Sequence, residues 1–157
     1  MKRLVLVRHG DTSGGDLSPA GERQASLLGR RLRDESSDFA LPDRLICSPA
    51  PRARQTASII GSFLRLLEPE EDGRLWSGPG GDPDGWEHDL IGLSRQLDRW
   101  GAEAGMLVVV THYEICCGLP PLLAVLYDLK GLVPNGLARG EGLWVEPGSG
   151  DWRLLRG

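Results

Sequence analysis

Long hydrophobic runs and an excess of positive charge are both missing from this sequence of 157 residues. A helix needs roughly 20 apolar residues to cross a bilayer, and the apolar run at 4–7 is too short even for the core of a secretion signal. We therefore expect a cytoplasmic protein with no membrane partner. The formal net charge of -4 provides no overall positive field, so we expect no nucleic acid as a partner either.

Paired cysteines are missing as well. The three cysteines, Cys47, Cys116 and Cys117, are odd in number and have no C-x-x-C spacing, which argues against a disulfide framework and against a zinc site. We expect them to be small buried residues, and we expect neither a metal nor a cofactor. With 40% apolar and 25% charged residues, the chain should form one globular domain over 1–157.

Short apolar segments alternate with amphipathic helical patterns along the chain, which predicts a mostly parallel sheet between two layers of helices. This α/β fold is a three-layer α/β/α sandwich. The predicted strands are 4–7, 44–47, a short one at 75–76, 106–110, and a closing pair at 137–145 and 152–155. The predicted helices are 19–33, one capped at Ser48-Pro49, 86–100, and one reaching about 128 with a break at Pro120-Pro121.

Three of the predicted strands lead into residues that can hold a phosphate group. The first ends in Arg8 and His9, the second leads to Arg52 in a helix's first turns, and the third leads to His112. Right-handed crossovers place the carboxyl ends of parallel strands on one rim of the sheet, so these side chains should converge. Arg54 lies about 200° around the helix from Arg52 and should face elsewhere.

Each of these residues alone has a plainer interpretation as a polar residue leaving a strand or lying on a helix surface. The longer segments around them are more specific. They read V-R-H-G-D-T at 7–12, L-S-P-A-G-E-R-Q-A at 17–25, S-P-A-P-R-A-R-Q-T-A at 48–57 and V-T-H at 110–112. In this order they resemble the histidine phosphatases of the phosphoglycerate-mutase-like superfamily, and the short spacings are most similar to small SixA-type phosphohistidine phosphatases.

The resemblance implies that His9 is a nucleophile that accepts a phosphoryl group, and that Arg8, Arg52 and His112 bind the phosphate oxygens. Physical chemistry agrees, because phosphoryl transfer needs in-line positioning and a cationic clamp on the equatorial oxygens. The attacking imidazole must be neutral, and a backbone carbonyl near Gly10 could hold its other nitrogen. We expect His112 to work protonated or as a hydrogen-bond donor.

Two further roles stay open at this point. Thr12 could donate its hydroxyl to the phosphate, although a threonine in a turn more often bonds its own backbone. Asp82 and Glu87 are candidates for a general acid, but Asp82 is equally suited to cap the helix predicted from 86. Glu114 could orient His112 or act as an acid, while its plainer interpretation is a surface carboxylate near a helix start.

The hypothesis that follows is a metal-independent phosphatase acting through phospho-His9. SixA-type enzymes are similar to this chain in lacking an obvious acid, which favours protein phosphohistidine as substrate and makes a small phosphorylated metabolite the alternative. A mutase would need a lid that excludes water, and no insertion in the sequence is long enough to form one. A non-catalytic phosphate-binding module is the remaining alternative. Specificity should lie in the rim loop, residues 77–84, and in the glycine-rich turns near the carboxyl end of the sequence.

Overall fold

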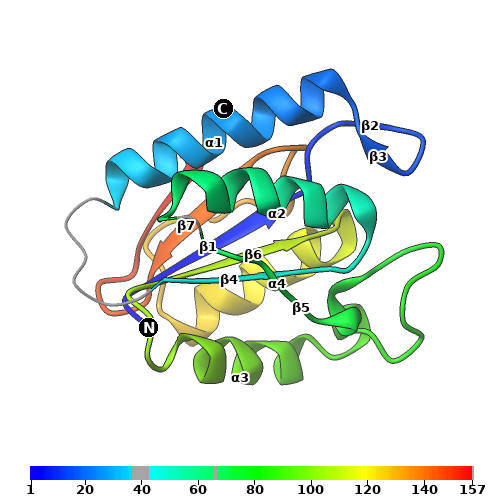
Figure 1. Ribbon diagram of the computed structural model, residues 1–157. Coiled ribbons are helices and arrows are strands. Elements are labelled where there is room, and N and C mark those ends of the chain that lie inside the picture. The colour runs from blue at the N-terminus through cyan, green and yellow to red at the C-terminus, as the bar shows by residue number, and fades with distance from the viewer. Residues whose placement is uncertain (37–42, 66, 157) are drawn as a thin grey trace.

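The computed structural model describes residues 1–36, 43–65 and 67–156 (Figure 1). Its main sheet has six strands in the order β5-β4-β6-β1-β7-β8. The strands are β1 (Arg3–Arg8), β4 (Arg44–Cys47), β5 (Glu70–Glu71), β6 (Met106–Thr111), β7 (Gly142–Glu146) and β8 (Asp151–Leu155), and β2 (Thr12–Ser13) with β3 (Asp16–Leu17) form a separate small hairpin. The helices are α1 (Pro19–Glu35), α2 (Pro51–Phe63), α3 (Leu90–Gly101) and α4 (Tyr113–Leu126).

The centre of the sheet is parallel. Strand β6 pairs in parallel with β1 on one side, where Arg8 lies opposite Thr111, and with β4 on the other, where Cys47 lies opposite Val110. The three strands therefore end at neighbouring positions along one edge. Strand β7 runs antiparallel to β1, and β8 closes the sheet in the predicted terminal hairpin.

The helices cover the sheet on both sides, α1 and α2 on one face and α3 and α4 on the other (Figure 1). Alternate residues of the central strands point to opposite faces, so that Leu4 packs towards α3 and α4 while Val5 packs towards α1 and α2. Both side chains are fully buried. The three-layer α/β/α fold predicted from the sequence is confirmed. None of the helices in the described ranges has the length and hydropathy of a membrane span.

Helix α1 begins as the sequence predicts. The Ser18 hydroxyl accepts the amide hydrogen of Gly21 at 3.0 Å, and Pro19 occupies the first helical turn, where its missing amide hydrogen costs nothing. Helix α2, in contrast, starts at Pro51 rather than at Pro49. The residue before a proline is disfavoured in helical conformation, so Ala50 stays extended and the cap expected at Ser48 does not form.

Two predictions for the middle of the chain are wrong. The strand predicted at 75–76 is a 3-10 turn, η1 (Gly73–Leu75). The helix predicted over 86–100 is divided into a 3-10 turn, η2 (Trp86–His88), and helix α3, because the Asp89 carboxylate accepts the amide hydrogen of Gly92 and caps a new helix there. Asp82 is therefore not the helix cap.

The break predicted at Pro120-Pro121 does not occur, and α4 runs through both prolines. Its apolar face, which includes Ile115, Leu119 and Leu123, packs into the core, and this burial outweighs the lost backbone hydrogen bonds. The strand predicted at 137–145 is shorter than expected, since only Gly142–Glu146 forms β7, of which 142–145 pairs with β1.

Candidate active site

His9 lies directly after β1 and is 6% exposed. Its Nδ1 is 2.8 Å from the carbonyl oxygen of Gly10. Because a carbonyl oxygen can only accept, this contact places the ring proton on Nδ1 and leaves the lone pair on Nε2 free to attack. The carbonyl anticipated from the sequence is therefore present in the structure, and the tautomer is the one that a nucleophilic imidazole needs.

The turn that follows His9 is held from both helices on its side of the sheet. The amide of Gly10 donates to Thr56 Oγ1 at 3.1 Å, and this hydroxyl donates to the carbonyl of Arg52 at 2.8 Å. On the other side, a Cβ added to Gly10 would lie 2.7 Å from the Gly21 carbonyl oxygen. The close approach of α1 therefore requires glycine at this point, and Thr56 is a supporting residue that the sequence did not reveal.

His112 occupies the N-cap position of α4 and is 2% exposed. Its Nε2 lies 2.8 Å from the Ser48 hydroxyl oxygen, and its ring centroid lies 5.2 Å from that of His9 with an interplanar angle of 65°. The structure thus brings together the ends of β1, β4 and β6 as predicted. Ser48, expected to cap a helix, is instead the partner of His112.

The two arginines differ in how they are held. Arg8 donates from Nη1 to the Leu137 carbonyl at 3.1 Å, its guanidinium stacks over the Tyr113 ring at 4.7 Å, and its buried Nε has no hydrogen-bond partner among the described residues. Arg52 is half-buried, and its charge acts on both histidines. Arg54 instead pairs with Glu71 at 3.5 Å on the exposed side, which confirms that it faces elsewhere.

Burial and positive charge keep both imidazoles neutral in the free protein. Burial, with the charges of Arg52 and Arg8, lowers the pKa of His9 to about 4, against the opposing effect of the Gly10 carbonyl. Burial, with the charges of Arg52, His9 and Arg8, lowers the pKa of His112 to about 3. His112 is therefore not protonated at neutral pH before a phosphate binds. The sequence predicted that it works either protonated or as a hydrogen-bond donor, and the second of these roles is the one compatible with a neutral ring.

Thr12 is half-buried in the small hairpin, where it pairs with Leu17. This hairpin was not anticipated, and it gives the Thr12 backbone a structural role. Asp82 accepts the amide hydrogen of Asp84 at 2.8 Å, a turn contact typical of aspartate before proline. Glu87 lies 3.3 Å from Nε2 of the exposed His88.

Glu114 is exposed in the first turn of α4, as its surface interpretation predicted, and it also contacts the rim loop. The Ser77 hydroxyl donates to its Oε2 at 2.8 Å, and the carboxylate's charge raises the pKa of Arg52 against the stronger lowering by burial. Ser77 itself is 2% exposed. This carboxylate therefore connects the rim loop to the side of the candidate site where Arg52 lies.

Arg139 is a further arginine close to His9. It donates to Asp11 Oδ1 at 2.8 Å, and the amide of its neighbour Gly140 donates to the carbonyls of Arg8 and His9, both at 3.1 Å. The charge of Arg139 also contributes to the low pKa of His9. The sequence gave no sign of the contact between Arg139 and Asp11.

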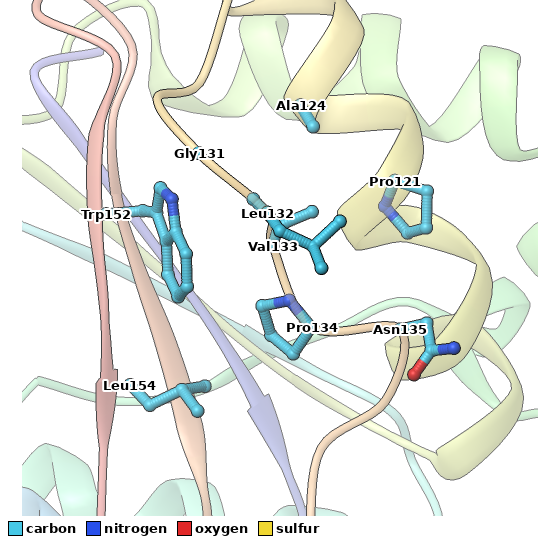
Figure 2. A pocket seen from close by; sticks show the side chains of 9 residues that line it. All are labelled: Pro121, Ala124, Gly131, Leu132, Val133, Pro134, Asn135, Trp152 and Leu154. Atoms are coloured by element: carbon cyan, nitrogen blue, oxygen red, sulfur yellow. The ribbon is translucent and has the colours of Figure 1, made fainter.

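A pocket of about 590 Å³ lies apart from these residues, between the second half of α4, the loop before β7, and β8 (Figure 2). The first of its α4 residues is nine positions beyond His112, which corresponds to about 13 Å along a helix. It therefore does not belong to the candidate active site. Its lining is mostly apolar, and consists of Pro121, Ala124, Gly131, Leu132, Val133, Pro134, Asn135, Trp152 and Leu154.

Comparison with known proteins identifies the family to which the chain belongs. The model of the histidine phosphatase superfamily (branch 1) matches residues 4–107, and the chain belongs to this superfamily. The match includes Arg8, His9 and Arg52 and ends before His112. An uncharacterized phosphatase, PhoE, from Bacillus subtilis is 35% identical over 83 residues, which are 46% of this chain and 40% of that protein. A 2,3-bisphosphoglycerate-dependent phosphoglycerate mutase from Nitratidesulfovibrio vulgaris is 34% identical over 88 residues, 49% of this chain and 31% of the mutase.

Solved structures share the fold over nearly the whole chain. A mycobacterial glucosyl-3-phosphoglycerate phosphatase superposes with a TM-score of 0.66 at 21% identity, covering 98% of this chain and 97% of that one. A phosphohistidine phosphatase of the SixA type from Agrobacterium tumefaciens superposes with a TM-score of 0.64 at 17% identity, covering 98% and 96%. These likenesses establish the architecture. The chain spans less than half the length of the curated relatives that it matches.

Proposed function

We propose that this protein is a phosphatase in which Nε2 of His9 takes a phosphoryl group from the substrate and passes it to water. The observation that carries this proposal is the bond between His9 Nδ1 and the Gly10 carbonyl, which leaves Nε2 unprotonated beside His112. Arg8, Arg52 and His112 bind the phosphate oxygens. The Nε of Arg8, which has no hydrogen-bond partner within the described part of the chain, and the half-buried Arg52 supply positive charge where the transferred group spreads its negative charge.

The reaction has two steps. His9 Nε2 attacks phosphorus in line with the leaving group, and the P–N bond forms as the bond to the leaving group breaks. Water then attacks the phosphorus of phospho-His9, and the bonding electrons return to Nε2 as inorganic phosphate forms. The low pKa of His9 keeps the nucleophile neutral throughout the physiological range, and no metal ion is required in either step.

The substrate proposed first is phosphohistidine in a protein. A protonated ring nitrogen is a good leaving group, so such a substrate makes little demand on a general acid. Asp82 accepts a backbone amide within its turn, and Glu87 pairs with His88, which supports a site that does not depend on either carboxylate. The fold shared with a SixA-type phosphatase supports the same choice.

Small phosphomonoesters are the second candidate, and the contact of Glu114 with the rim loop favours them. An ester oxygen is a poor leaving group unless it receives a proton, and Glu114 is a carboxylate near the phosphate-binding residues. The fold is also shared with a phosphatase of glucosyl-3-phosphoglycerate.

Trapping the phosphoenzyme tests the proposal. Wild-type protein is mixed with ³²P-labelled phosphoramidate in the presence of a chelator, quenched in alkali and digested. We expect label on the peptide that contains His9, and none in His9→Ala. A folded wild-type protein that hydrolyses phosphoramidate without labelling His9 would contradict the proposed mechanism. A parallel panel of a phosphohistidine protein, p-nitrophenyl phosphate and sugar phosphates then ranks the two substrate classes.

A further inference from the structure

Glu114 lies in the first turn of α4, two residues after His112. Its side chain is held in place by the rim loop, because the hydroxyl of the buried Ser77 donates to Oε2 at 2.8 Å. The second oxygen, Oε1, faces Gly78, where an added Cβ would lie 3.7 Å away. The carboxylate is thus fixed by one hydrogen bond and keeps one oxygen without a protein donor among the described residues.

The surroundings of this carboxylate connect it to the transferred phosphate. Its charge acts on Arg52, the guanidinium whose charge also acts on His9 and His112. Helix α4 begins directly after His112, so the carboxylate is placed by the same element that places this imidazole. Glu114 therefore belongs to the rim of the phosphate site on the side of Arg52 and His112.

We propose that Glu114 is the proton donor to the leaving oxygen of phosphomonoester substrates, and that Ser77 is its positioning residue. This proposal rests on phosphoryl transfer to His9 and adds a second substrate class to it. With a proton donor, the site can cleave P–O bonds to alkyl alcohols as well as P–N bonds.

The proton balance of the reaction is complete. In the first step His9 Nε2 bonds to phosphorus, the P–O bond breaks, and the carboxyl proton of Glu114 passes to the departing alkoxide to give a neutral alcohol. In the second step the Glu114 carboxylate takes a proton from the attacking water as the P–N bond breaks. The carboxyl group is then protonated again, and the products are the alcohol and inorganic phosphate.

Two other carboxylates of the middle region were candidates for the same role. Asp82 and Glu87 are less suited to the role, because Asp82 is engaged in a backbone turn and Glu87 faces His88.

The test is the dependence of Glu114→Gln on the leaving group. An alkyl phosphate such as 2-glycerophosphate needs the proton, whereas p-nitrophenyl phosphate and phosphoramidate do not. We expect E114Q to lose about 100-fold or more in kcat/KM for the alkyl ester and less than about 5-fold for the other two substrates. Ser77→Ala should show a smaller loss, again confined to the alkyl ester. The control is Glu103→Gln, an exposed carboxylate before β6, at the opposite end of the parallel strands.

Each outcome decides between the two proposals. Equal losses for all three substrates in a folded E114Q protein would assign Glu114 a structural role and overturn the inference. A wild-type protein that labels His9 from phosphoramidate but does not hydrolyse alkyl esters would also overturn it, while leaving the proposed function intact. A selective loss in Asp82→Asn with an unaffected E114Q would transfer the donor role to Asp82. Failure to label His9 at all would remove the proposed mechanism and this inference together.

Discussion

The imidazoles of His9 and His112 meet edge to face, with centroids 5.2 Å apart and planes at 65°. The distance is set by the sheet, because β1 and β6 are paired in register with Arg8 opposite Thr111, and each histidine is the next residue. A single phosphate group can contact both rings at this separation. In the proposed reaction, this pair of rings lies beside the transferred phosphoryl group.

The titration of His9 should respond to Arg139. The positive charge of Arg139 disfavours the imidazolium, so Arg139→Gln raises the pKa of His9 from its low value of about 4. The release of Asp11 from its ion pair acts in the same direction. The acid limb of kcat/KM then moves to higher pH, since the nucleophile is lost as it protonates. Ring-proton NMR titration measures the shift directly, and an unchanged His9 pKa would show that the two groups do not interact. Arg95→Gln, on the exposed side of α3, is the control.

Acid should destabilise the fold through the two buried imidazoles. Their pKa values are about 4 and about 3 in the folded protein and near 6.5 in the unfolded chain, so the unfolded chain binds more protons between these values. Stability is full above about pH 6.5 and falls as the pH drops towards 4, on the order of 3 kcal/mol for each histidine. Urea unfolding of His112→Gln should show a smaller loss between about pH 7 and pH 4. If the unfolding free energy of His112→Gln fell with decreasing pH as steeply as that of wild type, His112 would not be a source of the acid instability.

Gly21 should not accept a side chain. A Cβ at this position would lie 2.1 Å from the carbonyl oxygen of Asp11, so Gly21→Ala must push α1 away from the turn that follows His9. We expect a loss of about 1–3 kcal/mol in unfolding free energy and about 10-fold or more in kcat. Gly15→Ala is the matched control, because nothing lies within 4 Å of its added Cβ. Thermal unfolding and turnover of p-nitrophenyl phosphate provide both readouts, and equal behaviour of the two variants would contradict the close packing.

Ser48 should position His112 through its hydroxyl. In Ser48→Ala the ring loses its partner at Nε2, and we expect about a 10-fold loss in kcat/KM with about 1 kcal/mol of stability. The ring ¹⁵N shifts of His112 should change with it, which a purely structural loss elsewhere would not cause. Ser58→Ala, exposed on α2, controls for the removal of a hydroxyl. Unchanged His112 shifts in Ser48→Ala would mean that the hydroxyl does not hold the ring.

The sequence was sufficient to predict the central strands and the residues at their carboxyl ends, because these follow local rules. A short apolar run that stops at Arg8 and His9 is typical of a buried strand. Parallel pairing of this strand with the strand before His112 then brings its carboxyl end next to that histidine. The N-cap at Ser18 is equally local. Such features depend on a few neighbouring residues, and the structure confirms them.

Contacts that depend on the path of a loop could not be predicted from the sequence. Ser48 followed by proline has the pattern of a helix cap. In the structure the helix starts at Pro51 instead, and the Ser48 hydroxyl pairs with the distant His112. The bond between Ser77 and Glu114 requires the rim loop to turn back, which it does where Gly78 adopts a φ of 86°. Residues 37 apart in the chain have no local signal of such a contact.

Both imidazoles lie at the ends of strands with buried centres, so the integrity of the site depends on the integrity of the whole sheet. The amides of β1 and β6, Val7 and Val110 among them, should exchange with deuterium only when the molecule opens globally. A destabilising substitution far from residue 9 will therefore reduce the number of working molecules without altering the turnover of each one. Titration of competent protein, measured as the stoichiometry of rapid phosphorylation, separates these two effects.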